Sequence, residues 1–450
     1  MQNEVGAENY GFYFALFNFS LILNIMLDVG ITNFNNRNIA QNHQLISKHF
    51  SSLFVLKSTL SSLYFIICIG VAFIIGWGWF ELKLLLVLML NQFLASMILY
   101  LRSNISGLQF FRTDSIISVL DRTLMILICG LLLWGNFTGD TFRIEWFVYA
   151  QTASYFITAV IAFLIVISKC DFIKFHFDRT FFIAILKQSL PFALLIMLMA
   201  IYNRIDPVMI ERLSDNGEEQ SGIYAQGFRM LDAAINFAYL FPVLLLPMFS
   251  KMLRQKESIV QMVKLSSLLL LTPAIIIALC CIWYSGEIMQ LFYKEHAEVS
   301  APIFSYLIIC FFSVSITYIF GTLLTANGNL KLLNITAAAG IAINIILNVI
   351  LIPKYGAKGA AITSLCTQSA TALAQLIIAK SIFRFSINYR LIGALLLEIL
   401  VVSGTGYLAK KYIGNWYAGI SMMIFIGFVF AFAIRIISIK SIYHIIKNEA

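Results

Sequence analysis

The chain has 450 residues, of which 60% are hydrophobic and only 12% are charged, and its mean hydropathy is +0.87. Soluble domains carry about 25% charged residues and could not bury this much apolar surface. The composition therefore predicts a polytopic membrane protein and excludes a soluble enzyme, a nucleic-acid binder and a peripheral anchor. The formal net charge of +9 then indicates which loops face the cytoplasm, rather than a surface for DNA.

Apolar segments recur along the whole chain, and each is long enough to cross a bilayer as a helix. Helices are expected because every backbone polar group in lipid must be paired within its own segment, and the alternating segments of a barrel do not occur. The predicted fold class is all-α, with thirteen spans. In chain order they lie at 12–31, 50–76, 82–101, 115–135, 146–168, 189–210, 223–248, 262–284, 300–325, 332–352, 358–380, 391–409 and 415–437.

Four ionisable residues in the first five segments stand out: Asp28, Lys57, Asp121 and Arg122. Ionisable groups in a span are costly, so they usually face a partner or a cavity. Lys57 and Arg122 are candidate substrate-binding cations, whereas Asp28 and Asp121 are candidate ion-coupling carboxylates. The alternatives are that Lys57 extends back to the interface, that Asp28 caps the first segment, and that Asp121 is a counter-ion of Arg122.

The sixth and seventh segments carry four more ionisable residues. Arg204 and Asp206 lie in the outer part of the sixth, where Asp206-Pro207 is expected to bend the helix. Arg229 and Asp232 share one face of the seventh because their spacing is i, i+3. We interpret both arginines as substrate-binding and both aspartates as ion-coupling. Interfacial placement of Arg204 and an internal Arg229–Asp232 pair are the alternatives.

Prolines interrupt the seventh segment at Pro242 and Pro247 and the eighth segment at Pro273. A proline in a span removes a backbone hydrogen bond, so these positions are candidate hinges for transport or, alternatively, static kinks. Glu398 stands alone in the twelfth segment as a candidate proton site. The seven cysteines and five histidines show no metal-ligand spacing, so no metal and no cofactor are expected.

Lysine and arginine are distributed unequally between the two sets of loops. One set holds 19 of the 31 basic residues and the alternate set holds 8. The richer set is predicted to be cytoplasmic and includes the C-terminus, so thirteen spans place the N-terminus outside. A loop at 169–188 is the longest cytoplasmic connection and divides the chain.

Short matching motifs support a repeat, because Gly11-Phe12-Tyr13 and Gly222-Ile223-Tyr224 each open a segment after an outer loop. Two pseudo-symmetric helical halves are predicted, at residues 1–168 and 189–380, with a basic linker at 169–188 between them. The last predicted domain, residues 381–450, is a pair of spans followed by a cytoplasmic tail.

Several motifs along the chain resemble those of the polysaccharide biosynthesis and O-antigen flippases, which belong to the multidrug/oligosaccharidyl-lipid/polysaccharide exporter superfamily. Their order and spacing carry the resemblance over nearly the whole chain. The motifs are Gly6-Ala7-Glu8-Asn9-Tyr10-Gly11-Phe12-Tyr13, Asp28-Val29-Gly30, Asp206 through Ile210, Gly222-Ile223-Tyr224, Phe228-Arg229, Pro247, Leu324-Thr325-Ala326-Asn327-Gly328, Asn344, Asn348, Leu351-Ile352-Pro353, Gly356 and Gly359-Ala360-Ala361.

The resemblance implies a flippase of undecaprenyl-pyrophosphate-linked oligosaccharide in the bacterial inner membrane. It implies alternating access driven by H⁺ or Na⁺, contact with membrane lipids, and a glycan polymerase as a partner that family members often work beside. Family members have fourteen spans, and the early motif follows the first of them. Here that motif lies at residues 6–11, so the first span is expected to be missing, as a start codon assigned too late would explain.

Other functions remain open at this point. A multidrug or cation antiporter would share the fold, but it would favour carboxylates without several buried arginines. A lipid II flippase usually has additional spans for the carrier tail. A membrane glycan polymerase, which is an enzyme, typically has a large outer loop, whereas the longest outer connections here, near 211–222 and 285–299, are short. A lipid-scrambling role without a coupling ion is a further alternative. We therefore expect a transporter rather than an enzyme.

Overall fold

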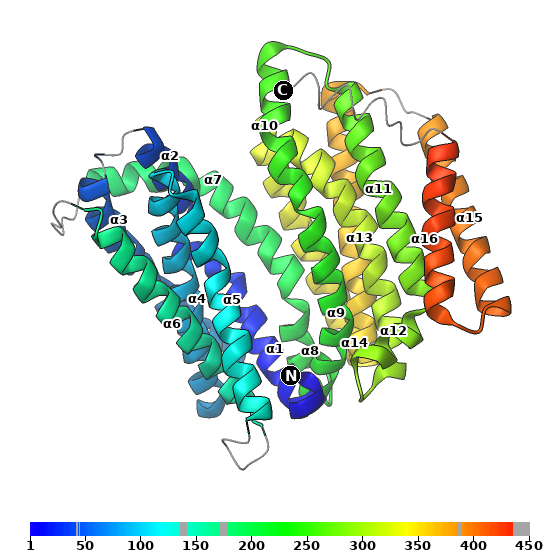
Figure 1. The fold of residues 1–450 in the computed structure, drawn as a ribbon, viewed down its shortest axis with the longest axis horizontal. Helices are drawn as coiled ribbons and strands as arrows, with labels where there is room; N and C mark the ends of the chain where they lie inside the picture. The colour runs from blue at the N-terminus through cyan, green and yellow to red at the C-terminus, as the bar shows by residue number, and fades with distance from the viewer. Residues whose placement is uncertain (42–43, 45, 136–141, 171–178, 386–388, 435–450) are drawn as a thin grey trace. The chain divides into compact units, whose positions relative to one another are not determined.

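The computed structural model describes residues 1–41, 44, 46–135, 142–170, 179–385 and 389–434. These residues form α-helices and one short 3-10 helix, with no strand among them, so the predicted all-α membrane class is confirmed (Figure 1). The chain divides into two units, Met1–Arg212 and Leu213–Ala450. The domain boundaries proposed from the sequence stay a prediction, and parts of the proposed linker (171–178) and tail (435–450) lie outside the described residues.

The first unit is built around α4, which packs against α1, α2, α3, α5 and α6. A regular series of buried residues along α4, including Leu85, Met89, Gln92, Ser96 and Tyr100, explains its central place. The elements are α1 (Gln2–Ile22), the 3-10 helix η1 (Asn24–Leu27), α2 (Ile31–Gln41), α3 (Ile46–Ile75), α4 (Trp79–Gly107), α5 (Phe111–Trp134), α6 (Ile144–Ile167), α7 (Arg179–Arg204) and α8 (Asp206–Leu213).

The second unit is built around α13, which packs against α9, α10, α11, α12 and α14. The last two helices, α15 and α16, pack against each other and against α11 (Figure 1). The elements are α9 (Gly217–Ala238), α10 (Leu240–Gln255), α11 (Val260–Trp283), α12 (Ser285–Phe292), α13 (Ala297–Ala326), α14 (Leu330–Phe383), α15 (Tyr389–Tyr412) and α16 (Trp416–Ala433).

The described residues contain ten helices that are long and apolar enough to span a membrane, or eleven if the bent pair of α7 and α8 is one span. This is fewer than the thirteen predicted, for two reasons. First, α1 is not among the ten, because polar residues such as Asn9 and Asn18 dilute its apolar character. Second, two predicted segments, 332–352 and 358–380, both lie in the single element α14.

The break in α14 shows why it contains two spans. A continuous helix of its 54 residues would be about 80 Å long, whereas the apolar core of a bilayer is about 30 Å thick. At Gly356 the backbone leaves the helical region, with φ 52° and ψ −135°. A Cβ on Gly359 would collide with the carbonyl oxygen of Leu351. In a straight helix these residues would lie about 12 Å apart, so the chain reverses direction here.

The predicted bend at Asp206-Pro207 is also present. Helices α7 and α8 meet at an angle of 42° on either side of Ile205. Proline at the second residue of α8 removes an N–H that the preceding helix would need for its next hydrogen bond. The three prolines that are candidate hinges sit in helices without ending them. Pro242 is in the first turn of α10, Pro247 is inside α10, and Pro273 is inside α11.

Candidate functional site

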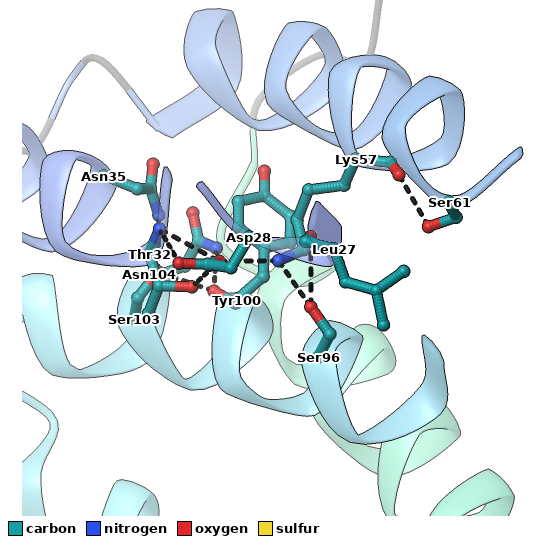
Figure 2. Close-up of polar contacts among 10 residues, drawn as sticks. All are labelled: Leu27, Asp28, Thr32, Asn35, Lys57, Ser61, Ser96, Tyr100, Ser103 and Asn104. Carbon is teal, nitrogen blue, oxygen red and sulfur yellow. Dashed lines mark hydrogen bonds and ion pairs between the residues drawn. The ribbon is translucent and has the colours of Figure 1, made fainter. Parts of the chain in front are cut away.

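Lys57 of α3 is buried within the first unit, with only 1% of its side chain exposed. Its Nζ lies 2.7 Å from Oδ1 of Asp28 and donates a second hydrogen bond of 2.8 Å to Oγ of Ser96 on α4 (Figure 2). The ammonium group of Lys57 is therefore held inside the unit rather than extended to its surface.

Asp28 occupies the short connection between η1 and α2. Its carboxylate accepts hydrogen bonds from the backbone N–H of Thr32 at 3.3 Å and from the hydroxyl of the same residue. Asp28 thus caps α2, rather than the first predicted segment. Val29 and Gly30 both adopt positive φ, 43° and 82°, which turns the chain tightly enough for this cap. The N-terminus of α2 and Lys57 both place positive charge beside the carboxylate.

The pair is supported by polar groups of α4. Oγ of Ser96 donates to the carbonyl of Leu27 at 3.2 Å while accepting from Lys57, so its position is fixed from two sides. The ring of Tyr100 has its centroid 5.8 Å from the Lys57 Nζ, and its hydroxyl donates to the carbonyl of Phe50 at 2.8 Å. An aromatic face at this distance attracts a cation, so Tyr100 adds to the pocket around the ammonium group.

Further polar contacts join α2 to α4 beside the pair (Figure 2). Nδ2 of Asn35 donates to Oγ of Ser103 at 2.8 Å, and Ser103 in turn donates to the carbonyl of Tyr100 at 2.7 Å. These contacts hold α2, and with it the Asp28 cap, against the central helix. The position of Asp28 relative to Lys57 therefore depends on three elements rather than on one flexible loop.

The polar groups continue one turn along α4 to Gln92. Its Oε1 accepts from Nδ2 of Asn24 at 2.5 Å, and its Nε2 donates to Oγ of Ser20 at 3.4 Å. The hydroxyl of Tyr64 donates to the carbonyl of Ser20 at 2.9 Å. Gln92 and Ser96 thus form one polar stripe on a helix whose other buried residues are mostly apolar, as the spacing of four residues requires.

The two members of the pair differ in access. Lys57 is covered, whereas the side chain of Asp28 is 26% exposed. A buried charge pair contributes little net stability, because desolvation offsets most of the attraction, but losing one member leaves an expensive unpaired charge. The carboxylate of this pair reaches the surface of the unit, whereas the lysine does not. A proton or a cation that binds the carboxylate, or an anion that binds the lysine, can therefore break the ion pair.

The predicted arginines lie elsewhere. Arg204, half-buried at the end of α7, is 3.5 Å from Oδ1 of Asn18 on α1 through its Nη1. Asp206, the first residue of α8, is fully buried. On α5, Arg122 is exposed and Asp121 is half-buried. The structure does not join any of these four residues to Lys57 or Asp28 through a described contact.

Arg229 and Asp232 belong to the second unit. Both lie on α9, where Arg229 is exposed and Asp232 is half-buried. Within the described residues no group of three or more histidine, cysteine, aspartate or glutamate side chains could hold a metal ion.

Sequence reasoning identified Asp28 and Lys57 separately and missed their pairing. It also missed Ser96, Tyr100 and Gln92. The available signal was the four-residue spacing of these three positions in an otherwise apolar segment, which places them on one helix face. That signal indicates a polar face on the fourth helix but does not say which charged residue meets it.

A family model described as "Polysaccharide biosynthesis protein" matches residues 1–253 of the chain. No curated protein matches it. Among solved structures, the lipid II flippase MurJ in an inward closed conformation is 15% identical, with a TM-score of 0.66, and the match covers 95% of this chain and 92% of that one.

Two transporter structures are also similar. An inward-facing multidrug resistance transporter of the MATE family is 13% identical, with a TM-score of 0.66 and coverage of 85% of this chain and 92% of that one. A transporter of the MOP superfamily from Pyrococcus furiosus, described as having a binding pocket of reversed polarity, is 14% identical, with a TM-score of 0.60 and coverage of 84% and 88%. At these identities the likeness shows a shared fold.

Proposed function

The chain belongs to the polysaccharide biosynthesis protein family, and on that premise we propose that it is a flippase. Its substrate is an undecaprenyl-pyrophosphate-linked oligosaccharide, the repeat unit of an O-antigen, capsule or exopolysaccharide. The protein moves this lipid across the bacterial inner membrane by alternating access, with its C-terminus in the cytoplasm. The observation that carries the proposal is the buried Lys57 held 2.7 Å from a partly exposed Asp28.

The pyrophosphate of the carrier is the part of the substrate that needs a cation inside the membrane. Lys57 supplies one, and its ammonium is already desolvated, so an incoming phosphate oxygen does not have to displace bulk water from it. Asp28 occupies the place that a phosphate oxygen takes on Lys57. Substrate and Asp28 therefore compete for the same cation, which keeps Lys57 neutralised when no substrate is bound.

A coupling ion changes the outcome of that competition. A proton or a sodium ion bound at the Asp28 carboxylate cancels its charge and frees Lys57 for the pyrophosphate. Release of the ion restores the pair and expels the anion. The 26% exposure of Asp28, compared with 1% for Lys57, gives the ion a route to the carboxylate while the lysine stays covered. This ordering links transport to a H⁺ or Na⁺ gradient.

The remaining candidates take supporting roles in this proposal. The arginines bind phosphate or the polar glycan, and the aspartates balance their charge or carry a coupling ion. Pro242, Pro247 and Pro273 are bend points during the cycle. The residues assigned to binding and charge balance are Arg122, Arg204 and Arg229, with Asp121, Asp206 and Asp232.

Replacing Lys57 by glutamine tests the proposal in cells that lack the native gene. Losing a charge-assisted hydrogen bond to phosphate should reduce surface glycan about 10- to 100-fold at equal membrane levels of protein. Arg102→Gln is the matched control. Arg102 pairs with Asp114 at the same 2.7 Å in the same unit, but both side chains are partly exposed, at 26% and 21%. Wild-type glycan from Lys57→Gln would contradict the proposal.

A lipid II flippase is a second candidate, favoured by the match to MurJ over 95% of this chain. Lipid II and the lipid-linked oligosaccharide are both attached to a polyprenyl pyrophosphate, so the same Lys57–Asp28 pair can bind either substrate. Depletion of the protein separates the two functions. Loss of surface glycan with normal cell-wall synthesis supports the first proposal, whereas cell lysis and accumulated lipid II support the second.

A further inference from the structure

Glu398 is a fully buried carboxyl group on α15 in the second unit. Neither of its carboxyl oxygens makes a hydrogen bond of ordinary geometry within the described part of the chain. Thr272 of α11 is also fully buried and lies close enough for its Oγ1 to act on the carboxyl group. Buried polar atoms are nearly always hydrogen-bonded, so these carboxyl oxygens require an explanation.

The surroundings of Glu398 are apolar in both directions along α15. One turn before it, Ala394 packs with Leu268 of α11 and Ala431 of α16. One turn after it, Val402 packs in a buried cluster that includes Ile276 of α11. Glu398 therefore sits between two apolar layers that join three helices.

Helix α16 packs closely against α11 and α15 about one turn from Glu398. A Cβ on Gly427 would come within 2.9 Å of Cδ1 of Ile276 and within 3.2 Å of Cγ2 of Val402. The absence of a side chain at Gly427 thus lets α16 close over α15 and α11. The carboxyl of Glu398 is covered by this packing rather than by a flexible loop.

None of the packed helices presents a cation to Glu398. Helix α16 has no charged residue, histidine or cysteine, and the charged residue of α11, Lys264, is exposed and about two turns from Thr272. The cysteines of α11, Cys280 and Cys281, lie about two turns beyond Thr272 in the other direction.

The basic residues of α15 itself lie towards its ends. The nearer of those towards its C-terminus, Lys410, is about three turns from Glu398 and donates to the carbonyl of Trp283 at 2.9 Å. Arg390 is about two turns away in the opposite direction and is exposed. A negative charge on Glu398 would therefore be uncompensated by the described residues of α11, α15 and α16 in this apolar, tightly packed site.

We propose that Glu398 is a proton-binding site of the transport cycle, protonated while α11, α15 and α16 are packed as in this structure. The inference rests on the proposed flippase function for its role in transport, but the protonation itself does not. A carboxyl group in such surroundings avoids the cost of a buried charge by keeping its proton. The protonated group also acquires a donor, which the neighbouring Oγ1 of Thr272 can accept after a small rotation.

Release of the proton requires the packing to open. When water enters between α11 and the α15–α16 pair, the O–H bond of the carboxyl breaks, the proton passes to water, and the electron pair stays on the carboxylate. The charged carboxylate opposes closure until a proton returns. Proton occupancy is thereby linked to the position of the last two helices, and an ion gradient can act on it.

Infrared difference spectroscopy on the purified protein tests protonation directly, whatever the protein transports. We expect a C=O stretching band of a protonated carboxylic acid at neutral pH that Glu398→Gln removes. Glu287→Gln is the matched control, because that glutamate is partly exposed and lies 3.8 Å from Lys410, and it should leave the band unchanged. A wild-type spectrum without a band that depends on Glu398 overturns the proposal.

Glu398→Met covers the case in which the glutamine variant misfolds. An apolar side chain of similar length should be tolerated if the native carboxyl is neutral, so its melting temperature in detergent should match or exceed that of the wild type. A large loss of stability would instead mean that Glu398 is charged and paired, and would overturn the inference.

Proton flux connects the site to transport. In vesicles with wild-type protein, substrate movement should be accompanied by proton movement, and Glu398→Gln should reduce the number of protons moved per substrate while leaving the protein folded. Unchanged proton movement in Glu398→Gln overturns the role of this site. Absence of substrate movement in the wild type would refute the flippase proposal instead, and the infrared result would still decide the protonation of Glu398.

Discussion

At the scale of single residues, one buried contact carries most of the functional argument. Lys57 and Asp28 are both recognisable in the sequence as ionisable groups in apolar segments. Their pairing was not predictable, because it depends on how η1 and the positive-φ turn at Val29 and Gly30 direct the chain back towards α3. Local sequence indicates that a buried charge needs a partner, but not which residue provides it.

Removing one member of the pair should cost far more stability than removing both. Asp28→Asn keeps a capping oxygen for α2 but leaves Lys57 buried beside a neutral group, and we expect a loss of about 3–5 kcal/mol. Adding Lys57→Met to the same protein should recover most of that loss. Denaturation of the single and double variants in mixed detergent micelles measures both values.

The Arg102–Asp114 pair provides the comparison for this experiment. Its side chains are partly exposed, so Asp114→Asn should cost at most about 1 kcal/mol. Equal losses for Asp28→Asn and Asp114→Asn would mean that the Lys57 ammonium is hydrated in the native protein.

At the scale of elements, apolar segments were predicted well and their interruptions less well. Each of the thirteen predicted segments overlaps a helix, because apolar runs of this length have few other stable forms in lipid. The short helices α2 and α12 were not predicted, because neither is a long apolar run. The bend before Pro207 was predicted, since proline acts through local sterics.

The reversal within α14 explains the glycines of its motif. Gly359 faces the carbonyl oxygen of Leu351, a backbone atom that cannot move without opening the turn. Gly359→Ala should therefore lower the free energy of unfolding by about 1–3 kcal/mol, as overpacking does. Gly404→Ala on α15 is the control, because no atom lies within 4 Å of its added Cβ, and it should change stability by less than about 1 kcal/mol. A tolerated Gly359→Ala would show that the turn is looser than the structure indicates.

At the scale of the whole molecule, composition predicts a multi-pass membrane protein but does not predict which substrate it moves. An apolar fraction of 60% leaves little alternative to a multi-pass membrane protein, and both units are indeed helical. The glycan cannot be predicted in the same way, because sugars are bound by scattered polar groups without a fixed spacing. In the proposed substrate, the pyrophosphate is the part whose charge a single buried residue such as Lys57 can bind.

The distribution of basic residues predicts the orientation of the chain. In a variant without its native cysteines, Asp215→Cys should react with a membrane-impermeant maleimide added to spheroplasts, because the turn before α9 faces outwards. Lys256→Cys, after α10, should react only once the membrane is opened. Both positions are exposed turns, so access rather than burial decides the labelling. The opposite pattern would invert the proposed topology.

Reconstitution tests the central claim most directly. Purified protein in proteoliposomes should move a polyprenyl-pyrophosphate-linked oligosaccharide between leaflets, measured by the access of a glycan-modifying enzyme added outside. We predict that Lys57→Gln slows this movement about 10- to 100-fold while Arg102→Gln retains it. Movement by Lys57→Gln at the wild-type rate would contradict the claim that the buried lysine carries the pyrophosphate across the membrane.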